Sequence, residues 1–142
     1  MIIIYNICSM DVKAVIEEAW NDRNLLKEKS TVDAIDQVIE KLDKGELRTA
    51  EIEKGDWVIN EWVKKAVVLY FPTRKMETIE VGPFEFHDKM KLKTNYSKKN
   101  VRVVPHAIAR YGSYVGENVI MMPSYINIGA YVDSGTMVDT WS

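Results

Sequence analysis

The stretch of sequence that decides the fold runs from residue 108 to residue 142 and reads IARYGSYVGENVIMMPSYINIGAYVDSGTMVDTWS. Aligned in groups of six, it begins every group with an aliphatic or aromatic residue: Ile108, Tyr114, Ile120, Ile126, Val132 and Val138. Four positions further on, the residues are small or compatible with a turn: Gly112, Asn118, Ser124, Ala130, Thr136 and Ser142. Strands repeat every two residues and helices about every 3.6 residues, so neither element alone explains a period of six.

A three-sided solenoid does explain this period, because each group of six supplies one short strand and one corner. The large residue then points into the prism, and the small residue lies near the turn. The alternative is a pair of hairpins in a small β-sandwich, but turns in sandwiches come about every 8 to 12 residues and seldom keep one phase for so long. The sequence therefore predicts about two turns of a solenoid, which begins near residue 101 and stops at Ser142 within a repeat.

The preceding residues indicate a small domain of mixed helices and strands. Spacings of three and four between apolar residues, together with turn signals, predict a helix over 11–23, a helix over 32–44, a hairpin joining 47–52 to 57–59, and a helix over 61–71. Ser30 or Thr31 is the expected N-cap of the second helix, and Gly45 is placed to end it. Residues 73–100 are rich in lysine and have little periodicity, which is typical of a solvated, partly extended connector. The lysines between Lys89 and Lys99 favour an exposed face, with an anion-binding site as the less favoured alternative.

These patterns divide the chain into an apolar leader (1–10), a small α/β domain with its connector (11–100) and an incomplete solenoid (101–142). The leader lacks the positive start and cleavage site of a signal peptide, and Met10 is a second candidate start of translation. Its Cys8 is the only cysteine, which suits a reducing compartment; we expect no catalytic role for Cys8, because no histidine lies near it in sequence.

Composition argues against several classes of partner. The net charge of -2 gives no electrostatic reason to bind nucleic acid or an anionic membrane, and no apolar run is long enough to span a bilayer. The two histidines, His87 and His106, are too few for the three-histidine metal site of a solenoid carbonic anhydrase. We therefore expect a small-molecule partner, no metal, and ordinary, partly exposed roles for both histidines.

Two runs within the repeat carry a specific resemblance. Residues 122–133 (MPSYINIGAYVD) and 135–141 (GTMVDTW) resemble the signature of tetrahydrodipicolinate N-succinyltransferases. Upstream, the chain is similar to the same family, in the same order, at Trp57, 62–67 (WVKKAV), 88–89 (DK) and 101–105 (VRVVP). The resemblance covers nearly everything after Asp11, although the stretch 87–94 and the loop after the first helix differ. Members of the family continue through further coils.

The resemblance implies an α+β domain followed by a left-handed parallel β-helix, here truncated. It also implies transfer of a succinyl group from succinyl-CoA to the amino group of opened tetrahydrodipicolinate, a step in the diaminopimelate route to lysine. We expect succinyl-CoA as a co-substrate, no tightly bound cofactor, a homotrimer and a cytoplasmic location. The CoA-binding residues would lie in coils beyond residue 142. For that reason both succinyl and acetyl stay open as the donor group.

Two positions match substrate-contacting residues of the family. Arg102 would hold a substrate carboxylate through its planar guanidinium, and Asp139 would bind the reacting amine and accept its proton. Taken from this sequence alone, a surface arginine at the domain junction is the favoured interpretation of Arg102, and either Asp139 or Asp133 could be a solvated corner residue. The alternative to an enzyme is a catalytically inactive remnant or interaction module of the same family.

Overall fold

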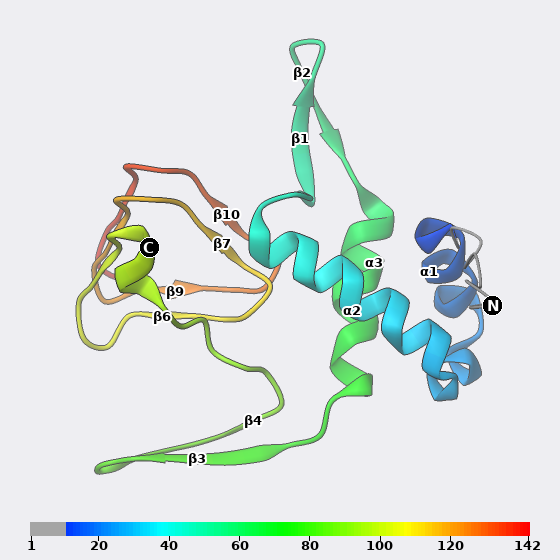
Figure 1. The fold of residues 1–142 in the computed structure, drawn as a ribbon, viewed down its shortest axis with the longest axis horizontal. Coiled ribbons are helices and arrows are strands. Elements are labelled where there is room, and N and C mark those ends of the chain that lie inside the picture. The colour runs from blue at the N-terminus through cyan, green and yellow to red at the C-terminus, as the bar shows by residue number, and fades with distance from the viewer. Residues whose placement is uncertain (1–10) are drawn as a thin grey trace, which may run out of the picture.

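The computed structural model describes residues 11–142, so the leader 1–10 and the prediction for Cys8 lie outside the described residues. Its first half contains three α-helices, which Figure 1 shows crossing one another at one end of the molecule. They are α1 (Val12–Asn21), α2 (Lys29–Lys44) and α3 (Glu61–Tyr70), with short 3-10 helices η1 (Arg23–Lys27) and η2 (Phe71–Thr73). The three predicted helices are thus confirmed. None of the helices in 11–142 is long and apolar enough to cross a membrane.

Local sequence explains where these helices begin and end. The carboxylate of Asp11 accepts hydrogen bonds from the backbone N–H groups of Lys13 and Ala14, which caps α1. Gly45 ends α2 in the left-handed region at φ 77°, as predicted. The predicted N-cap of α2 is wrong, because the helix begins three residues before Val32 with Glu28 at the cap. Thr31 is instead buried within the helix.

The helices bury a core that also includes part of the second half of the chain. Its fully buried members include Ile16, Ile35, Ile39, Val63 and Leu69, and Ile128 from the predicted solenoid packs into the same cluster. The carboxyl end of α2 therefore lies directly against the region that follows residue 101. This packing positions the two halves relative to each other.

Two hairpins project from the helices (Figure 1). Strands β1 (Ala50–Glu53) and β2 (Asp56–Ile59) form the predicted hairpin. Strands β3 (Glu77–Val81) and β4 (Phe84–Asp88) form a second hairpin, which corrects the prediction of a connector over 73–100. The missed signal was the alternation of Ile79, Val81, Phe84 and Phe86 with polar residues around Gly82-Pro83. A 3-10 helix, η3 (Tyr96–Lys99), then precedes the coils.

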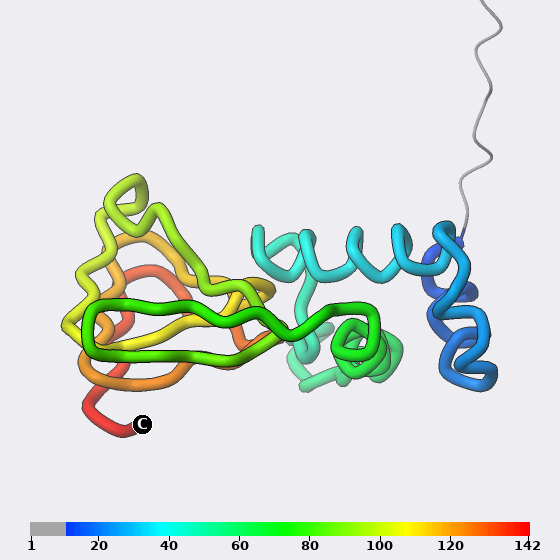
Figure 2. Tube along the Cα trace, turned by 90° about the horizontal axis from the view of Figure 1, so that it is seen from below, coloured from blue at the N-terminus to red at the C-terminus, as the bar shows by residue number. Residues whose placement is uncertain are grey.

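From residue 102 the chain winds in stacked turns, seen in Figure 2 from yellow-green to red. Seven strands of two residues each follow: β5 (Arg102–Val103), β6 (Ile108–Ala109), β7 (Tyr114–Val115), β8 (Ile120–Met121), β9 (Tyr125–Ile126), β10 (Tyr131–Val132) and β11 (Met137–Val138). All pair in parallel, in the ladders β5-β8-β11, β6-β9 and β7-β10. Each strand from β8 onward stacks on the strand three places earlier in the chain, so the repeat is a three-sided parallel solenoid. The sandwich alternative is therefore wrong.

The phase of the repeat differs from the predicted one in its first half. Ala109, Val115 and Met121 are the buried residues, whereas Ile108, Tyr114 and Ile120, which were predicted to point inward, are only partly buried. From Ile126 onward the predicted inward residues are correct, because Val132 pairs with buried Val115 and Val138 with buried Met121, and both pack against the core of the prism. The reason for the difference is a single shortened step: Arg102 pairs with Ile120, 18 positions later, but Ile120 pairs with Met137, only 17 positions later. Met121 and Ile126 are therefore consecutive inward residues only five positions apart.

Candidate functional site

Arg102 opens β5, the first strand of the three-stranded ladder. Its backbone N–H donates to the carbonyl of Val119 at 2.9 Å, which fixes its place against β8. The side chain is exposed, and among residues 11–142 it has no hydrogen-bond or ion-pair partner. A guanidinium on a rigid strand with its donors free is able to bind an anion from solution.

Asp139 follows β11, the last strand of the same ladder, at a corner of the prism. One carboxylate oxygen, Oδ1, accepts a hydrogen bond from the backbone N–H of Thr140 at 2.7 Å. Asp133 makes the same bond to Ser134 at 2.8 Å, and Asn127 makes it to Ile128 at 2.9 Å. The three residues stand six apart and share one corner geometry, so this hydrogen bond has a structural role at each of them. Within 11–142, Oδ2 of Asp139 has no partner and stays free for a ligand.

The structure does not bring Arg102 and Asp139 into contact within one chain. Arg102 lies on β5 and Asp139 directly after β11, the two outer strands of the ladder, with β8 between them. Two strand spacings amount to about 10 Å, and Asp139 stands two residues beyond Met137, which shares the level of Arg102. A ligand that touched both side chains would have to bridge this separation.

Beside the Asp139 corner lies a cavity of about 310 Å³, lined by His106, Ile108, Ser124, Tyr125, Trp141 and Ser142. Three successive coils supply this wall, because His106, Ser124 and Trp141 follow β5, β8 and β11. The rings of His106 and Trp141 lie 6.4 Å apart. The sequence did not suggest this grouping, since both histidines were expected to be ordinary surface residues. His106 is indeed exposed, as is His87, whose Nδ1 contacts Thr78 at 2.8 Å.

No group of three histidine, cysteine, aspartate or glutamate side chains suited to a metal ion occurs within residues 11–142. Within the described residues, the ladder therefore carries an arginine without a partner, a carboxylate with one oxygen free, and a cavity lined in part by aromatic rings. This arrangement suits recognition of a small polar molecule with an anionic group.

Comparison with known proteins relates the first part of the chain to a family. Residues 11–73 match the family model described as tetrahydrodipicolinate N-succinyltransferase N-terminal. The helices α1 to α3 and the first hairpin fall within that match. The described structure then continues into parallel coils, beyond the part that the family model covers.

Curated relatives extend the similarity over nearly the whole chain. The chain is 45% identical to 2,3,4,5-tetrahydropyridine-2,6-dicarboxylate N-succinyltransferase of Dechloromonas aromatica over 139 residues, which cover 92% of this chain and 51% of the relative. It is 43% identical to the protein of the same name from Acinetobacter baylyi, over 92% of this chain and 52% of the relative. The corresponding figures for Paraburkholderia phymatum are 47%, 89% and 50%.

The resemblance predicted from the sequence is therefore confirmed. The chain is related to the tetrahydrodipicolinate N-succinyltransferases, and residues 11–73 correspond to their N-terminal domain. The chain spans about half the length of the curated relatives that it matches.

Proposed function

We propose that this chain forms the acceptor-binding part of an N-succinyltransferase. The acyl group would pass from succinyl-CoA to the amino group of tetrahydrodipicolinate in its opened 2-amino-6-oxopimelate form, in the diaminopimelate route of lysine biosynthesis. The observation that carries the proposal is the 45% identity over 139 residues to a protein with that name. The free side chains of Arg102 and Asp139 on one ladder support it.

In the proposed mechanism Arg102 holds a carboxylate of the acceptor through two parallel N–H bonds. Oδ2 of Asp139 orients the acceptor amine and takes its proton as the nitrogen attacks the thioester carbonyl. A carbon–nitrogen bond forms and the carbon–sulfur bond breaks, and the proton taken by Asp139 passes to the departing sulfur, so that CoA leaves as its thiol. The hydrogen bond from Thr140 to Oδ1 would hold the carboxylate still during this step.

The separation of Arg102 and Asp139 within one chain supports a homotrimer, in which residues of adjacent copies would complete each site. Exposed apolar faces on both hairpins support association too: Trp57 is 70% exposed on β2, and Phe84 is 62% exposed on β4. Faces on two different parts of one chain suit a head-to-tail contact, which closes into a ring of three when successive copies are rotated by one third of a turn. We further propose that the coils are left-handed, that the protein is cytoplasmic and holds no tightly bound cofactor, and that CoA binds to coils beyond residue 142.

An inactive remnant or interaction module of the same family is the second candidate. The observation that favours it is the apolar edge of the last ladder strand, where Met137 is 61% exposed, which suits association with another chain. A reading frame that resumes the repeat in phase after Ser142 would favour the enzyme. Its absence would favour the remnant.

Release of free CoA from succinyl-CoA, with and without the dicarboxylate acceptor, tests the proposal. The assay would use the chain alone and the chain mixed with any product of a downstream frame. We expect acceptor-dependent release, reduced about 100-fold or more in Asp139→Ala. No release in any mixture, from protein that circular dichroism shows to be folded, would support the remnant.

Asp133→Ala is the matched control. It removes an identical corner hydrogen bond, on Ser134, from the preceding repeat. Equal losses in Asp133→Ala and Asp139→Ala would mean that the corner bond matters and that Asp139 has no role in the chemistry. Arg102→Lys should raise the KM for the acceptor, because an ammonium cannot make the paired bonds of a guanidinium.

A further inference from the structure

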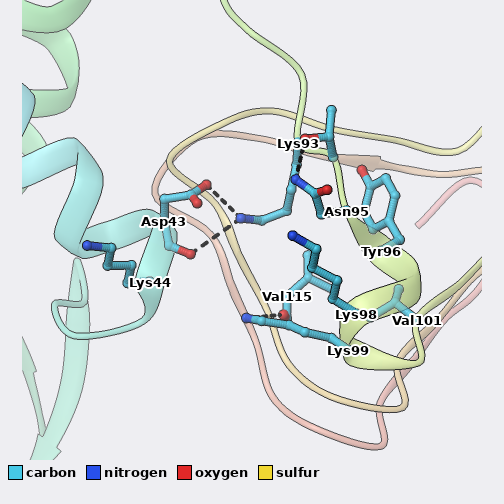
Figure 3. A pocket seen from close by; sticks show the side chains of 10 residues that line it. Asp43, Lys44, Lys93, Asn95, Tyr96, Lys98, Lys99, Val101 and Val115 are labelled. Carbon is cyan, nitrogen blue, oxygen red and sulfur yellow. Dashed lines mark hydrogen bonds and ion pairs between the residues drawn. The ribbon is translucent and has the colours of Figure 1, made fainter.

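A second cavity, of about 320 Å³, lies between the carboxyl end of α2 and the 3-10 helix η3. Figure 3 shows its lining, in which the ammonium groups of Lys93, Lys98 and Lys99 face the same space, whereas that of Lys44 points away from it. Lys44 lies at the end of α2, Lys93 in the segment before η3, and Lys98 and Lys99 in η3. The cavity shares no residue with the wall beside Asp139.

Two of these four lysines have their charge neutralised. Lys93 is 2.6 Å from the carboxylate of Asp43, and it also donates to the Asp43 carbonyl at 3.3 Å. Its side chain is only 11% exposed, so this pair ties the segment before η3 to α2. Lys44 pairs with Glu40, one helical turn earlier, at 2.7 Å.

The other two lysines lack an acidic partner. No carboxylate within residues 11–142 forms an ion pair with Lys98 or Lys99. Lys99 donates to the carbonyl of Val115 at 3.3 Å and lies 4.5 Å from the centre of the Tyr114 ring. Oδ1 of Asp43 accepts from Lys93 at 2.6 Å and from the backbone N–H of Gly112 at 2.9 Å, so the single negative charge of Asp43 balances that of Lys93. The cavity therefore carries an excess of two positive charges.

Neutral hydrogen-bond donors complete the lining. Burial raises the pKa of Tyr96, against an opposing hydrogen bond with the backbone of Ala109, so its hydroxyl keeps its proton at neutral pH. The side chains of Thr94 and Asn95 lie on the same wall. Two cations with neutral donors beside them are the chemistry that recognises a doubly charged anion.

We propose that this cavity binds a small dianion that carries phosphate or carboxylate groups, with Lys98 and Lys99 as its cationic contacts. The cavity lies between α2, η3 and the first coils, so the site exists only in the folded chain. The ligand therefore stabilises the folded chain, and its binding weakens as ionic strength rises.

The test is the thermal unfolding midpoint of the whole chain, titrated at constant ionic strength with inorganic phosphate, succinate, acetate or chloride. We expect phosphate or succinate to raise the midpoint more than acetate and chloride do. A response to phosphate alone identifies a phosphate compound as the ligand, and a response to succinate alone identifies a dicarboxylate. Equal responses to all four anions, or no response, would overturn the proposal.

Substitutions then locate the binding. Lys98→Gln and Lys99→Gln should each weaken binding of the effective anion about tenfold, while Lys98→Arg keeps it. Lys13→Gln is the matched control, because Lys13 is exposed on α1, far from the cavity. Undiminished binding in the double variant Lys98→Gln/Lys99→Gln, or an equal loss in Lys13→Gln, would contradict the assigned site. Since Lys98 is exposed, its replacement should leave the circular dichroism spectrum unchanged.

Discussion

Gly45 has two separate reasons to be glycine. It ends α2 in the left-handed region, and a Cβ at this position would lie 2.6 Å from the ring of Tyr114 on β7. The first reason concerns only the turn, whereas the second concerns the packing of the helical part against the coils. A substitution can distinguish them.

We expect Gly45→Ala to lower the free energy of unfolding by about 2 to 4 kcal/mol, the sum of left-handed strain and overpacking. Gly82→Ala is the control, because Gly82 has φ 56° but nothing within 4 Å of its ideal Cβ. The control should lose only about 1 to 2 kcal/mol. Urea unfolding measures both, and equal losses would mean that the Tyr114 ring moves aside without cost.

Asp36 supplies a prediction about pH. Burial raises the pKa of Asp36 above its ordinary value of 3.8, while its ion pair with Arg74 opposes the shift. Because the folded state favours the neutral acid, this stabilising contribution is fully present below pH 3.8 and is lost as the pH rises through the folded-state pKa. Asp36→Asn cannot ionise, so the parent should lose stability relative to this variant as the pH rises.

The measurement is the difference in free energy of unfolding between the two proteins, from urea titrations at a series of pH values. A constant difference across the series would contradict the prediction. A parent that gains stability relative to Asp36→Asn as the pH rises would also contradict it, because the attraction of Arg74 for the ionised carboxylate would then outweigh the effect of burial.

At the scale of the elements, the shortened step between Met121 and Ile126 decides which side chains fill the prism. Met121 is fully buried, whereas its neighbour Ile120 is only partly buried. The six-residue alignment gave the opposite assignment for this pair. The two residues therefore provide a direct comparison of the predicted and observed phases.

Met121→Ala should cost about 2 to 5 kcal/mol, because it opens a cavity inside the prism. Ile120→Ala should cost only about 1 kcal/mol, since its side chain already contacts solvent. Chemical unfolding of the two variants gives the comparison. A larger loss of stability in Ile120→Ala than in Met121→Ala would mean that Ile120 points into the prism, as the sequence predicted.

How well each element could be predicted depended on how long its sequence pattern is. The helices and the first hairpin have patterns of ten residues or a clear turn, and their existence was predicted correctly. The second hairpin was missed because its alternating residues stand beside a lysine-rich segment, which suggested a solvated connector. The inward-facing residues of the first coils were predicted wrongly because the alignment in sixes assumes a constant period. The five-residue step between Met121 and Ile126 becomes visible only from the strand pairing.

The candidate site was less predictable than the fold. Arg102 and Asp139 came from resemblance, and their separation across β8 depends on pairing between distant parts of the chain. The corner hydrogen bonds of Asp133 and Asp139 follow from local geometry, so the equivalence of these residues was visible in the sequence. The lysine run suggested an anion-binding site only as the less favoured alternative to an exposed face. The cavity itself was not predictable, because α2 and η3 are more than 50 residues apart and meet only in the folded chain.

At the scale of the whole molecule, the outer edge of β11 and the side chains beside it are the most exposed part of the coils. Met137 and Trp141 are exposed there, and within residues 11–142 β11 pairs with β8 alone. An unpaired strand edge next to apolar side chains is a template for association. We expect the 142-residue chain to self-associate through this edge.

Met137→Lys should lower the average mass of the chain measured by sedimentation, because a charge on the edge strand opposes pairing. Met76→Lys is the matched control, since Met76 is also exposed but lies before β3. An equal fall in mass for both variants would mean that added charge alone prevents association. No fall in Met137→Lys would place the contact elsewhere, for example on the hairpins.

The 17-residue turn that contains the shortened step also bears on how genes for such chains can change in length. Loss of one complete turn joins strands that already stack on each other, as Ile120 and Met137 do, and leaves the order of the three faces intact. Loss of six residues keeps the large side chains pointing inward but moves each later strand to the next face. Asp139 would then leave the ladder that begins with Arg102. Viable insertions and deletions within the coils should therefore be inherited as complete turns.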